Sequence, residues 1–176
     1  NPHDIMSINT ASAALYISGM PFEGPVGATR LAHLDGKWIA NPTYQQGDES
    51  TFELVVAGRE LADGDVAIMM VEAGGTHGAF KKYAAGAQKI TEEVLIEGLE
   101  ESKKWISAAI KIQKDLRDAV VAERGEIAAI TYTPNVDYTD EVMDAVKAAV
   151  GDDTSKAMLI ADKHDRQLRL DEIKAQ

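Results

Sequence analysis

The first apolar segment of the chain lies at residues 4–18, where nearly every position is apolar or small. Asp4 can cap a helix at the start of this segment, Pro2 lies just outside it, and Gly19 and Pro21 end it. The pattern therefore predicts a helix over 4–18. Because a helix that is apolar on every side is typically buried, we expect the rest of its domain to enclose it.

Residues 25–71 carry short runs of β-branched and apolar residues between turn signals, a pattern typical of strands. An Asp-Gly hairpin turn stands at 35–36, a second turn at 62–64, and a polar loop at 45–50. The last strand becomes a continuous apolar run, which indicates a strand covered on both faces. The strands that follow from this pattern are 26–34, 37–40, 52–57 and 65–71.

Beyond Gly74-Gly75 the pattern is helical for most of the chain. A short helix is expected over 79–87, and Thr91 can cap a long amphipathic helix of roughly 30 residues, because its apolar residues share about a third of the circumference. Those residues are Leu95, Leu99, Ile106, Ala109, Ile110, Leu116 and Val120. An extended piece at 127–132 and two further helices, at 140–150 and from about 155 to the end, complete the pattern.

The predicted fold class is α+β, with strands and a helix in residues 1–78 followed by an all-α part in residues 79–176. Trp38 and Trp105 both stand in patterns that predict burial of at least one face, so we expect them to be packing anchors.

Composition narrows the function classes. The chain of 176 residues has no cysteine, which excludes disulfides and thiolate-bound metal sites. No apolar run approaches the roughly 18 residues that a membrane span needs, and no secretory signal opens the chain, so we expect a cytoplasmic protein with no membrane partner. The net charge of −11 disfavours nucleic-acid binding unless basic residues cluster locally.

Several blocks of sequence resemble polynucleotide phosphorylase, the polyribonucleotide nucleotidyltransferase family, and one of them is similar to its actinobacterial branch. The blocks are 1–15 (NPHDIMSINTASAAL), 19–27 (GMPFEGPVG), 41–43 (NPT), 54–58 (LVVAG) and 65–73 (DVAIMMVEA). The resemblance implies that residues 1–78 are the C-terminal part of the first RNase PH-like (ribosomal protein S5 domain 2-like) domain. It also implies that 79–176 belong to the all-helical domain. Because Pro2 leads directly into an apolar stretch, we expect a piece of a longer protein.

The family resemblance implies a homotrimeric, phosphate-dependent 3′-to-5′ exoribonuclease that acts in RNA degradation and mRNA turnover. In the family, the catalytic groups and the Mg²⁺ site lie in the second RNase PH-like domain. The active copy there has a serine-rich turn that holds phosphate, and an Asp-x-Lys pattern on a strand. We therefore expect no cofactor in this segment and Mg²⁺ in the full enzyme.

The matching positions of this chain have lost those groups. Pro2, His3 and Asp4 replace the serine-rich turn, and a carboxylate there should repel phosphate. Glu53 keeps an acid where the family has Asp, but Val55 replaces the lysine and offers no cation. We interpret Asp4 as an N-cap rather than a metal ligand, and Asp48 and Glu49 as a solvated loop. No catalytic residue and no metal site are assigned.

Lys81, Lys82 and Lys89 form the main basic cluster of the first ninety residues and are the candidates for RNA contact in the full enzyme. An exposed helix face is the alternative for these lysines. For the whole chain, the leading hypothesis is a non-catalytic structural segment. One alternative is a degenerate nucleotide-binding or regulatory module related to guanosine polyphosphates, and another is a docking domain on the acidic helices of 91–176.

Overall fold

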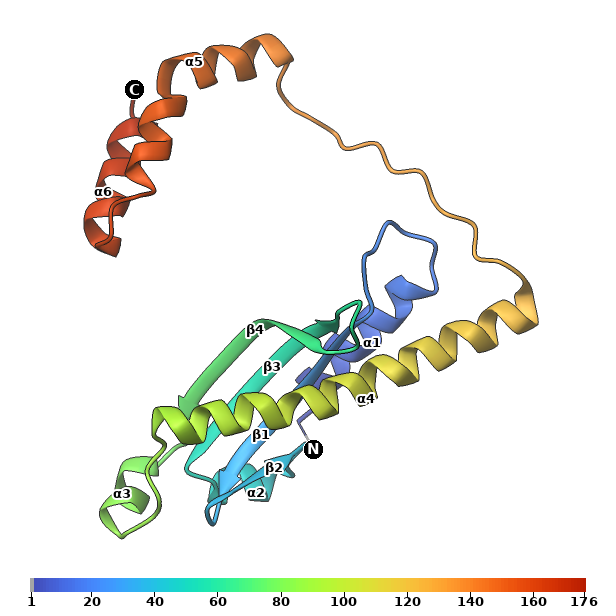
Figure 1. The fold of residues 1–176 in the computed structure, drawn as a ribbon, viewed down its shortest axis with the longest axis vertical. Coiled ribbons are helices and arrows are strands. Elements are labelled where there is room, and N and C mark those ends of the chain that lie inside the picture. The colour runs from blue at the N-terminus through green and yellow to red at the C-terminus, as the bar shows by residue number, and fades with distance from the viewer. Residues whose placement is uncertain (1) are drawn as a thin grey trace. The chain divides into compact units, whose positions relative to one another are not determined.

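The computed structural model describes residues 2–176; Asn1, which opens the first block of resemblance, lies outside the described residues. The chain divides into two compact units, one that ends at Tyr132 and one that covers Thr133–Gln176 (Figure 1). Among the described residues, every strand lies in the first unit and the second is helical, so the α+β class is confirmed.

One antiparallel sheet organises the first unit, with the strand order β2-β1-β3-β4. All four predicted strands are present, and β1 and β2 begin and end at the predicted residues. Asp35, with φ of 49°, and Gly36, with φ of 75°, make the hairpin turn between them. The strands are β1 Val26–Leu34, β2 Lys37–Ala40, β3 Phe52–Glu60 and β4 Val66–Gly75.

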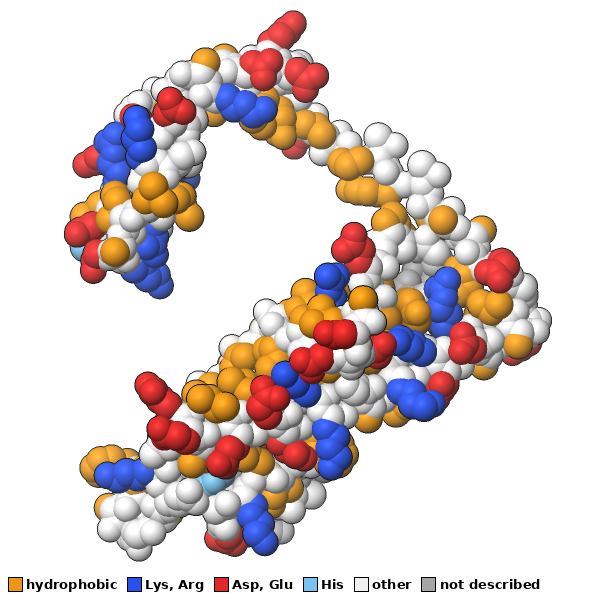
Figure 2. Space-filling model, in the orientation of Figure 1, with side chains coloured by type: hydrophobic (Ala, Val, Ile, Leu, Met, Phe, Trp, Pro, Cys, Tyr) orange, Lys and Arg blue, Asp and Glu red, His pale blue; other side chains and the backbone are white. Residues whose placement is uncertain are grey.

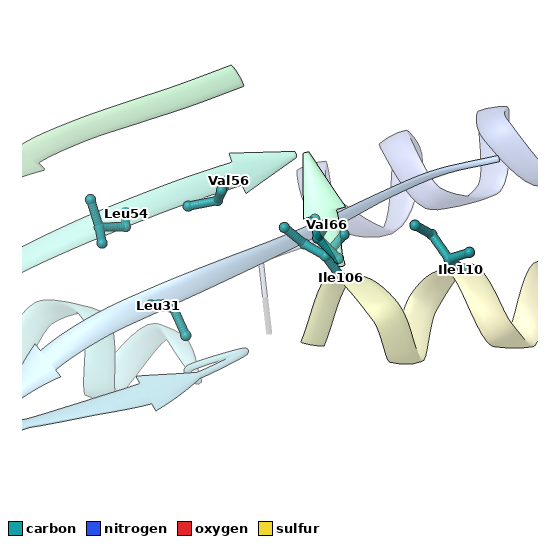
Figure 3. Packing of buried hydrophobic residues seen from close by; sticks show 6 residues of the cluster. All are labelled: Leu31, Leu54, Val56, Val66, Ile106 and Ile110. Carbon is teal, nitrogen blue, oxygen red and sulfur yellow. The ribbon is translucent and has the colours of Figure 1, made fainter. Parts of the chain in front are cut away.

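Helices cover both faces of the sheet. Alternate residues of a strand point to opposite faces, so Leu54 faces the long helix α4 (Glu92–Arg124) while Val55 faces α1 (Asp4–Tyr16). The core beneath α4 is buried, and Figure 3 shows its side chains on the strands and on the helix. Its members are Leu31, Leu54, Val56, Val66, Ile106 and Ile110. Ile5, Ala28, Val55 and Ala57 form a smaller core under α1.

The long helix α4 begins as predicted, because the Thr91 hydroxyl accepts a hydrogen bond from the Val94 N–H. Trp38 Nε1 donates to the Val94 carbonyl at 3.0 Å, which fixes the start of the helix on β2. The prediction that Trp38 and Trp105 are packing anchors is confirmed, since both pack against the main core. Gly98 lets the helix approach closely: a Cβ there would lie 2.6 Å from the indole of Trp38.

The apolar stripe of α4 was predicted too long. Leu116 is 41% exposed, although Ile106 and Ile110 on the same face are fully buried. The reason is that the sheet ends there: Gln113 Nε2 already donates to the carbonyl of Val26, the first residue of β1. Beyond Gln113, the helix contacts the first unit through polar side chains: Lys114 pairs with Glu60 at the end of β3, and Arg117 donates to the carbonyl of Tyr16.

The expectation of an enclosed first helix is wrong for the part of the chain that the structure describes. Only Ile5 and Ser12 of α1 are buried, whereas Met6 is 63% exposed. The sheet lies on one side of α1 only. Asn9 holds the helix there, because its amide donates to and accepts from the backbone of Ala28.

The prediction that the last strand is covered on both faces is also wrong. Val66 at its start is buried, but Met69 and Val71 are 61% and 46% exposed. The strand lies at the edge of the sheet, and α4 crosses mainly β1 and β3. The continuous apolar run of β4 therefore does not indicate that its side chains are buried within residues 2–176.

The polar loop of residues 45–50 is a short helix, α2 (Tyr44–Glu49). Thr43 and Gln46 form a capping box, in which the Thr43 hydroxyl accepts from the Gln46 N–H and the Gln46 side chain accepts from the Thr43 N–H. The Thr-x-x-Gln spacing was a signal for this helix in the sequence. The expectation of a loop at these residues is therefore wrong.

The remaining helices follow the predicted order with different bounds, and residues 127–132 form no strand. The helices are α3 (Ala79–Ala84), α5 (Asp140–Ala157) and α6 (Lys163–Lys174). Helix α5 runs through Gly151, which has open space around it, and ends at Ala157; Asp162, whose carboxylate caps α6, follows after a short turn. The domain boundary after residue 78 stays a prediction. Spatial contacts instead divide the chain after Tyr132. Helix α4 belongs to the first unit because it packs on the sheet.

Candidate functional site

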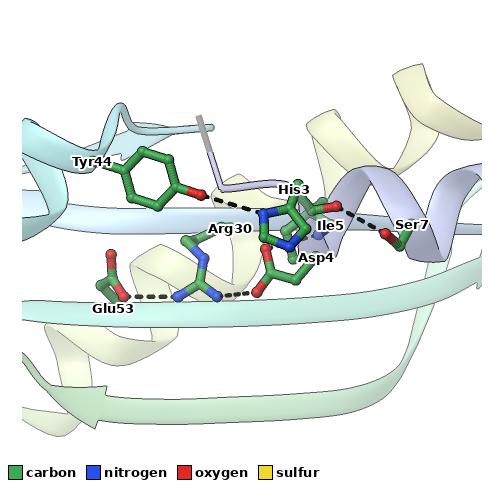
Figure 4. Close-up of polar contacts among 7 residues, drawn as sticks. All are labelled: His3, Asp4, Ile5, Ser7, Arg30, Tyr44 and Glu53. Carbon is green, nitrogen blue, oxygen red and sulfur yellow. Dashed lines mark hydrogen bonds and ion pairs between the residues drawn. The ribbon is translucent and has the colours of Figure 1, made fainter.

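A cavity of about 410 Å³ lies where the start of α1 meets β1, β3 and α2. It contains the positions that the family resemblance compares with a phosphate site. Figure 4 shows its centre, where Arg30 extends between Asp4 and Glu53. The lining residues are Pro2, His3, Asp4, Arg30, Thr43, Tyr44, Gly47, Asp48, Glu53, Thr76 and His77.

Arg30 joins three elements through two ion pairs. Its Nη2 lies 2.5 Å from Asp4 Oδ2 on α1, and its Nη1 lies 2.7 Å from Glu53 Oε2 on β3. The register explains the second pair: Arg30 stands directly opposite Val55, so Glu53, two residues before Val55, is its diagonal neighbour on the same face. The side chain of Arg30 is only 17% exposed.

The electrostatics favour this pairing over ionic contacts with a ligand. Burial works against ionisation of Asp4, but the Ile5 N–H and the Arg30 guanidinium outweigh it and lower the pKa of the Asp4 carboxyl. Burial likewise opposes the charge on Arg30, and the two carboxylates more than compensate, so the pKa of Arg30 is raised. With neutral histidines, the three carboxylates and one guanidinium that line the cavity leave a formal charge of −2.

The sequence interpretation was correct about Val55 and incomplete about its surroundings. Val55 is 5% exposed and packs against Ile5 in the core under α1, so it offers no cation. Sequence reasoning missed Arg30, which supplies a guanidinium from the neighbouring strand. An arginine inside a predicted strand was a possible signal, but only the cross-strand register places it beside Glu53.

The interpretation of Asp4 as an N-cap is corrected by the structure. His3 occupies the N-cap position and makes no side-chain capping bond, while Asp4 is the first residue of α1 and accepts from the Ile5 N–H at 2.8 Å. The other carboxylate oxygen of Asp4, Oδ2, accepts a hydrogen bond from the Arg30 guanidinium. His3 Nδ1 lies 3.4 Å from Tyr44 Oη, which brings α2 to the same cavity.

The acidic residues of the cavity do not fit a divalent metal. Asp4 Oδ2 and Glu53 Oε2, which a cation would need, both accept from the guanidinium of Arg30. Within residues 2–176, no group of three or more His, Asp or Glu side chains is arranged to hold a metal ion. Carboxylate oxygens are the ligands that Mg²⁺ prefers, and here they neutralise an arginine instead.

The three candidate lysines lie in different surroundings. Lys82 on α3 donates from Nζ to the carbonyls of Asp48 and Ser50, at 2.6 and 2.7 Å, and so satisfies groups at the C-terminal end of α2. Lys81 on the same helix is exposed, as is Lys89 in the segment that follows. Lys82 is thus turned toward the body of the first unit, whereas Lys81 and Lys89 face solvent.

A second cavity, of about 710 Å³, lies between the β1–β2 turn, the end of α2 and the segment after α3. His33 lines it and is 2% exposed, with its ring 5.0 Å from that of Trp38 and its Nδ1 3.4 Å from Thr51 Oγ1. Burial lowers the pKa of His33, although Glu97 opposes the shift. The ring is therefore a neutral part of the core at neutral pH.

A family model covers the sheet and the beginning of α4. Residues 24–104 match the 3′ exoribonuclease family, domain 2. The polyribonucleotide nucleotidyltransferase of Salinispora tropica is 45% identical over 175 residues. The chain is a homologue of one segment of the polyribonucleotide nucleotidyltransferases. The RNase PH-like fold expected from the resemblance is thereby confirmed, with a helical segment after it.

Further relatives give the same result. Polyribonucleotide nucleotidyltransferases of Streptomyces avermitilis and Acidothermus cellulolyticus are 42% and 44% identical and match 98% and 97% of this chain. The Salinispora tropica match covers 99% of this chain but 22% of the relative, and the other two cover 23% and 21%. The chain therefore spans less than a quarter of the length of these relatives. No helix of residues 2–176 is long and apolar enough to cross a membrane.

Proposed function

We propose that the chain is a non-catalytic structural segment of a phosphate-dependent 3′-to-5′ exoribonuclease of RNA degradation and mRNA turnover. The relatives' name, polyribonucleotide nucleotidyltransferase, supports the enzyme class. The paired guanidinium of Arg30 supports the non-catalytic role. Phosphoryl transfer needs cations that are free to hold the phosphate, and this cation is held by Asp4 and Glu53.

The charge of the cavity supports the same proposal. A phosphate that entered would meet a formal charge of −2 and would have to displace a carboxylate from Arg30. Both steps cost free energy, because the ion pairs are partly buried and the repulsion is only partly screened. Instead, the ion pairs of Arg30 connect β1 with α1 and β3, which is a structural role.

For the intact protein, we propose the remaining family properties. These are a homotrimer in the cytoplasm that acts on RNA, uses Mg²⁺ in its second RNase PH-like domain, and contacts RNA in this segment through the basic cluster. The members of that cluster are Lys81, Lys82 and Lys89. The acidic helices of 91–176 would support the catalytic domain.

A degenerate nucleotide-binding module is the second candidate, and Arg30 is the observation in its favour, because it places a guanidinium at the cavity. Titration of GDP into ¹⁵N-labelled protein tests this alternative. Shifts of the amide signals of residues 2–5 and 47–55 that saturate would support nucleotide binding. Unchanged signals at millimolar GDP would eliminate it.

The non-catalytic role is tested by incubating the chain with oligo(A), inorganic phosphate and Mg²⁺ and measuring released ADP. We expect no phosphate-dependent ADP from the wild-type chain. Glu53→Ala and Glu72→Ala are prepared in parallel, because Glu72 is an exposed acid on the neighbouring strand β4. ADP release that requires phosphate, disappears in Glu53→Ala and persists in Glu72→Ala would refute the proposal.

A further inference from the structure

The segment between Glu72 and Glu92 differs in charge from the rest of the chain. It contains three lysines and no acidic residue, although the whole chain has a net charge of −11. It leaves the edge strand β4, forms α3 and continues to the cap of α4. Nucleic-acid affinity depends on such local clusters of cations rather than on the total charge of a protein.

Helix α3 is attached to the first unit by one face. Ala79 is 7% exposed, Lys82 donates to the carbonyls of Asp48 and Ser50, and the Tyr83 hydroxyl donates to the carbonyl of Thr51 at 3.2 Å. Residues three and four apart share a face of a helix, so these three form the attached side. The residues between them, Phe80 and Lys81, are left on the outward side.

Phe80 is the unusual residue of that outward side. It is 85% exposed, and the exposed Lys81 follows it directly. Figure 2 shows orange hydrophobic and blue basic side chains next to each other over α3. An exposed phenyl ring and unpaired lysines in one segment are the two kinds of group that single strands use, because bases stack on aromatic rings while lysines contact the phosphates. Neither Lys81 nor Lys89 makes an ion pair within residues 2–176.

We infer that Phe80 is a stacking platform for a base of single-stranded polyribonucleotide, with Lys81 and Lys89 contacting the backbone phosphates. The inference rests on the proposed function, because the polyribonucleotide is the substrate class of the relatives. It also narrows that function. Lys82 acts as an anchor of α3, and recognition is independent of sequence because every base has a π-face.

The test measures binding of fluorescein-labelled oligo(A) to the 176-residue chain at several salt concentrations by fluorescence anisotropy. We expect Phe80→Ala and Phe80→Leu to weaken binding about tenfold, and Phe80→Trp to retain it, because only an aromatic ring stacks. The exposed position of Phe80 makes these variants compatible with the fold. Met69→Ala, which removes another exposed apolar side chain of the same unit, is the matched control and should bind like the wild type.

Salt dependence separates the two kinds of contact. Each lysine that contacts a phosphate of a single strand contributes about 0.7 to the slope of log K against log salt. Lys81→Ala/Lys89→Ala should therefore reduce the slope by about 1.4, whereas Phe80→Ala should lower affinity and leave the slope unchanged. Lys111→Ala, an exposed lysine paired with Asp115, is the control for charge alone and should change neither quantity appreciably.

Four results would overturn the inference. The first two are absence of salt-dependent oligo(A) binding by the wild type, and oligo(A) binding by Phe80→Ala that equals that of the wild type. The third is competition by inorganic polyphosphate as strong as that by unlabelled oligo(A), which would identify a simple polyanion contact. The fourth is a sedimentation coefficient of Phe80→Ala that differs from the wild type without RNA, which would identify a contact between protein molecules. Failure of the proposed function is separate, because ADP release by the chain refutes the scaffold role whatever Phe80 does.

Discussion

Replacing Arg30 by methionine tests whether the ion-paired guanidinium holds the first unit together. The variant keeps most of the apolar stem but leaves Asp4 and Glu53 without their partner. Exposed ion pairs contribute about 0–1 kcal/mol, and breaking a fully buried pair costs about 3–5 kcal/mol. Here the side-chain exposures are 17% for Arg30, 52% for Asp4 and 26% for Glu53, so the site lies between these limits.

We therefore expect Arg30→Met to lower the free energy of unfolding by about 2 kcal/mol. With a urea slope of about 2 kcal/mol per molar, the midpoint should fall by about 1 M. Urea titration followed by tryptophan emission measures this, because Trp38 and Trp105 both lie in the first unit. Glu53 should account for more of the loss than Asp4, since it is the less exposed carboxylate.

The control for this experiment is Arg59→Met. Arg59 lies on the neighbouring strand β3, is 44% exposed and pairs at 3.6 Å with Glu23, which is 96% exposed, so its loss should change the midpoint little. The double variant Arg30→Met/Glu53→Gln should recover part of the stability, because it removes the unpaired carboxylate. If Arg30→Met unfolds at the same urea concentration as Arg59→Met, the stabilising role assigned to Arg30 is refuted.

Four further outcomes follow from the packing and the electrostatics of the chain. Gly98→Ala should lower the free energy of unfolding by about 1–3 kcal/mol, because its Cβ would lie 2.6 Å from the indole of the β2 tryptophan. Gly151→Ala, with open space around it in α5, should raise helix stability by about 0.5–1 kcal/mol, and circular dichroism melting distinguishes the two signs. Ile106→Ala should cost about 2–5 kcal/mol and Ile112→Ala, 69% exposed, under about 0.5 kcal/mol in urea titration; equal losses would contradict the core assignment. Burial depresses the pKa of His33 in the folded state, so the unfolded chain binds more protons at low pH and stability falls as the pH drops below the ordinary value of 6.5. Urea midpoints measured from pH 8 to pH 5 should therefore fall less in His33→Gln than in the wild type. Identical pH profiles of the two proteins would contradict this.

Local sequence patterns determined the secondary structure and the family. The strands, the Asp-Gly turn and the capped long helix α4 follow from residues within a few positions of one another, which is why they could be predicted. The same holds for the blocks of resemblance, whose family the comparisons bear out. The absence of a cationic side chain at Val55 was also visible in the sequence.

Tertiary structure decided what surrounds those elements. Arg30 meets Glu53 only through the register of β1 and β3, and meets Asp4 only because α1 packs on that face of the sheet. The exposure of Met6 and Met69 has the same origin: an apolar side chain is buried only where another element lies against it, and sequence periodicity does not say which face is covered. Pairing across strands and coverage of faces join residues that are distant in the chain, so no local pattern encodes them.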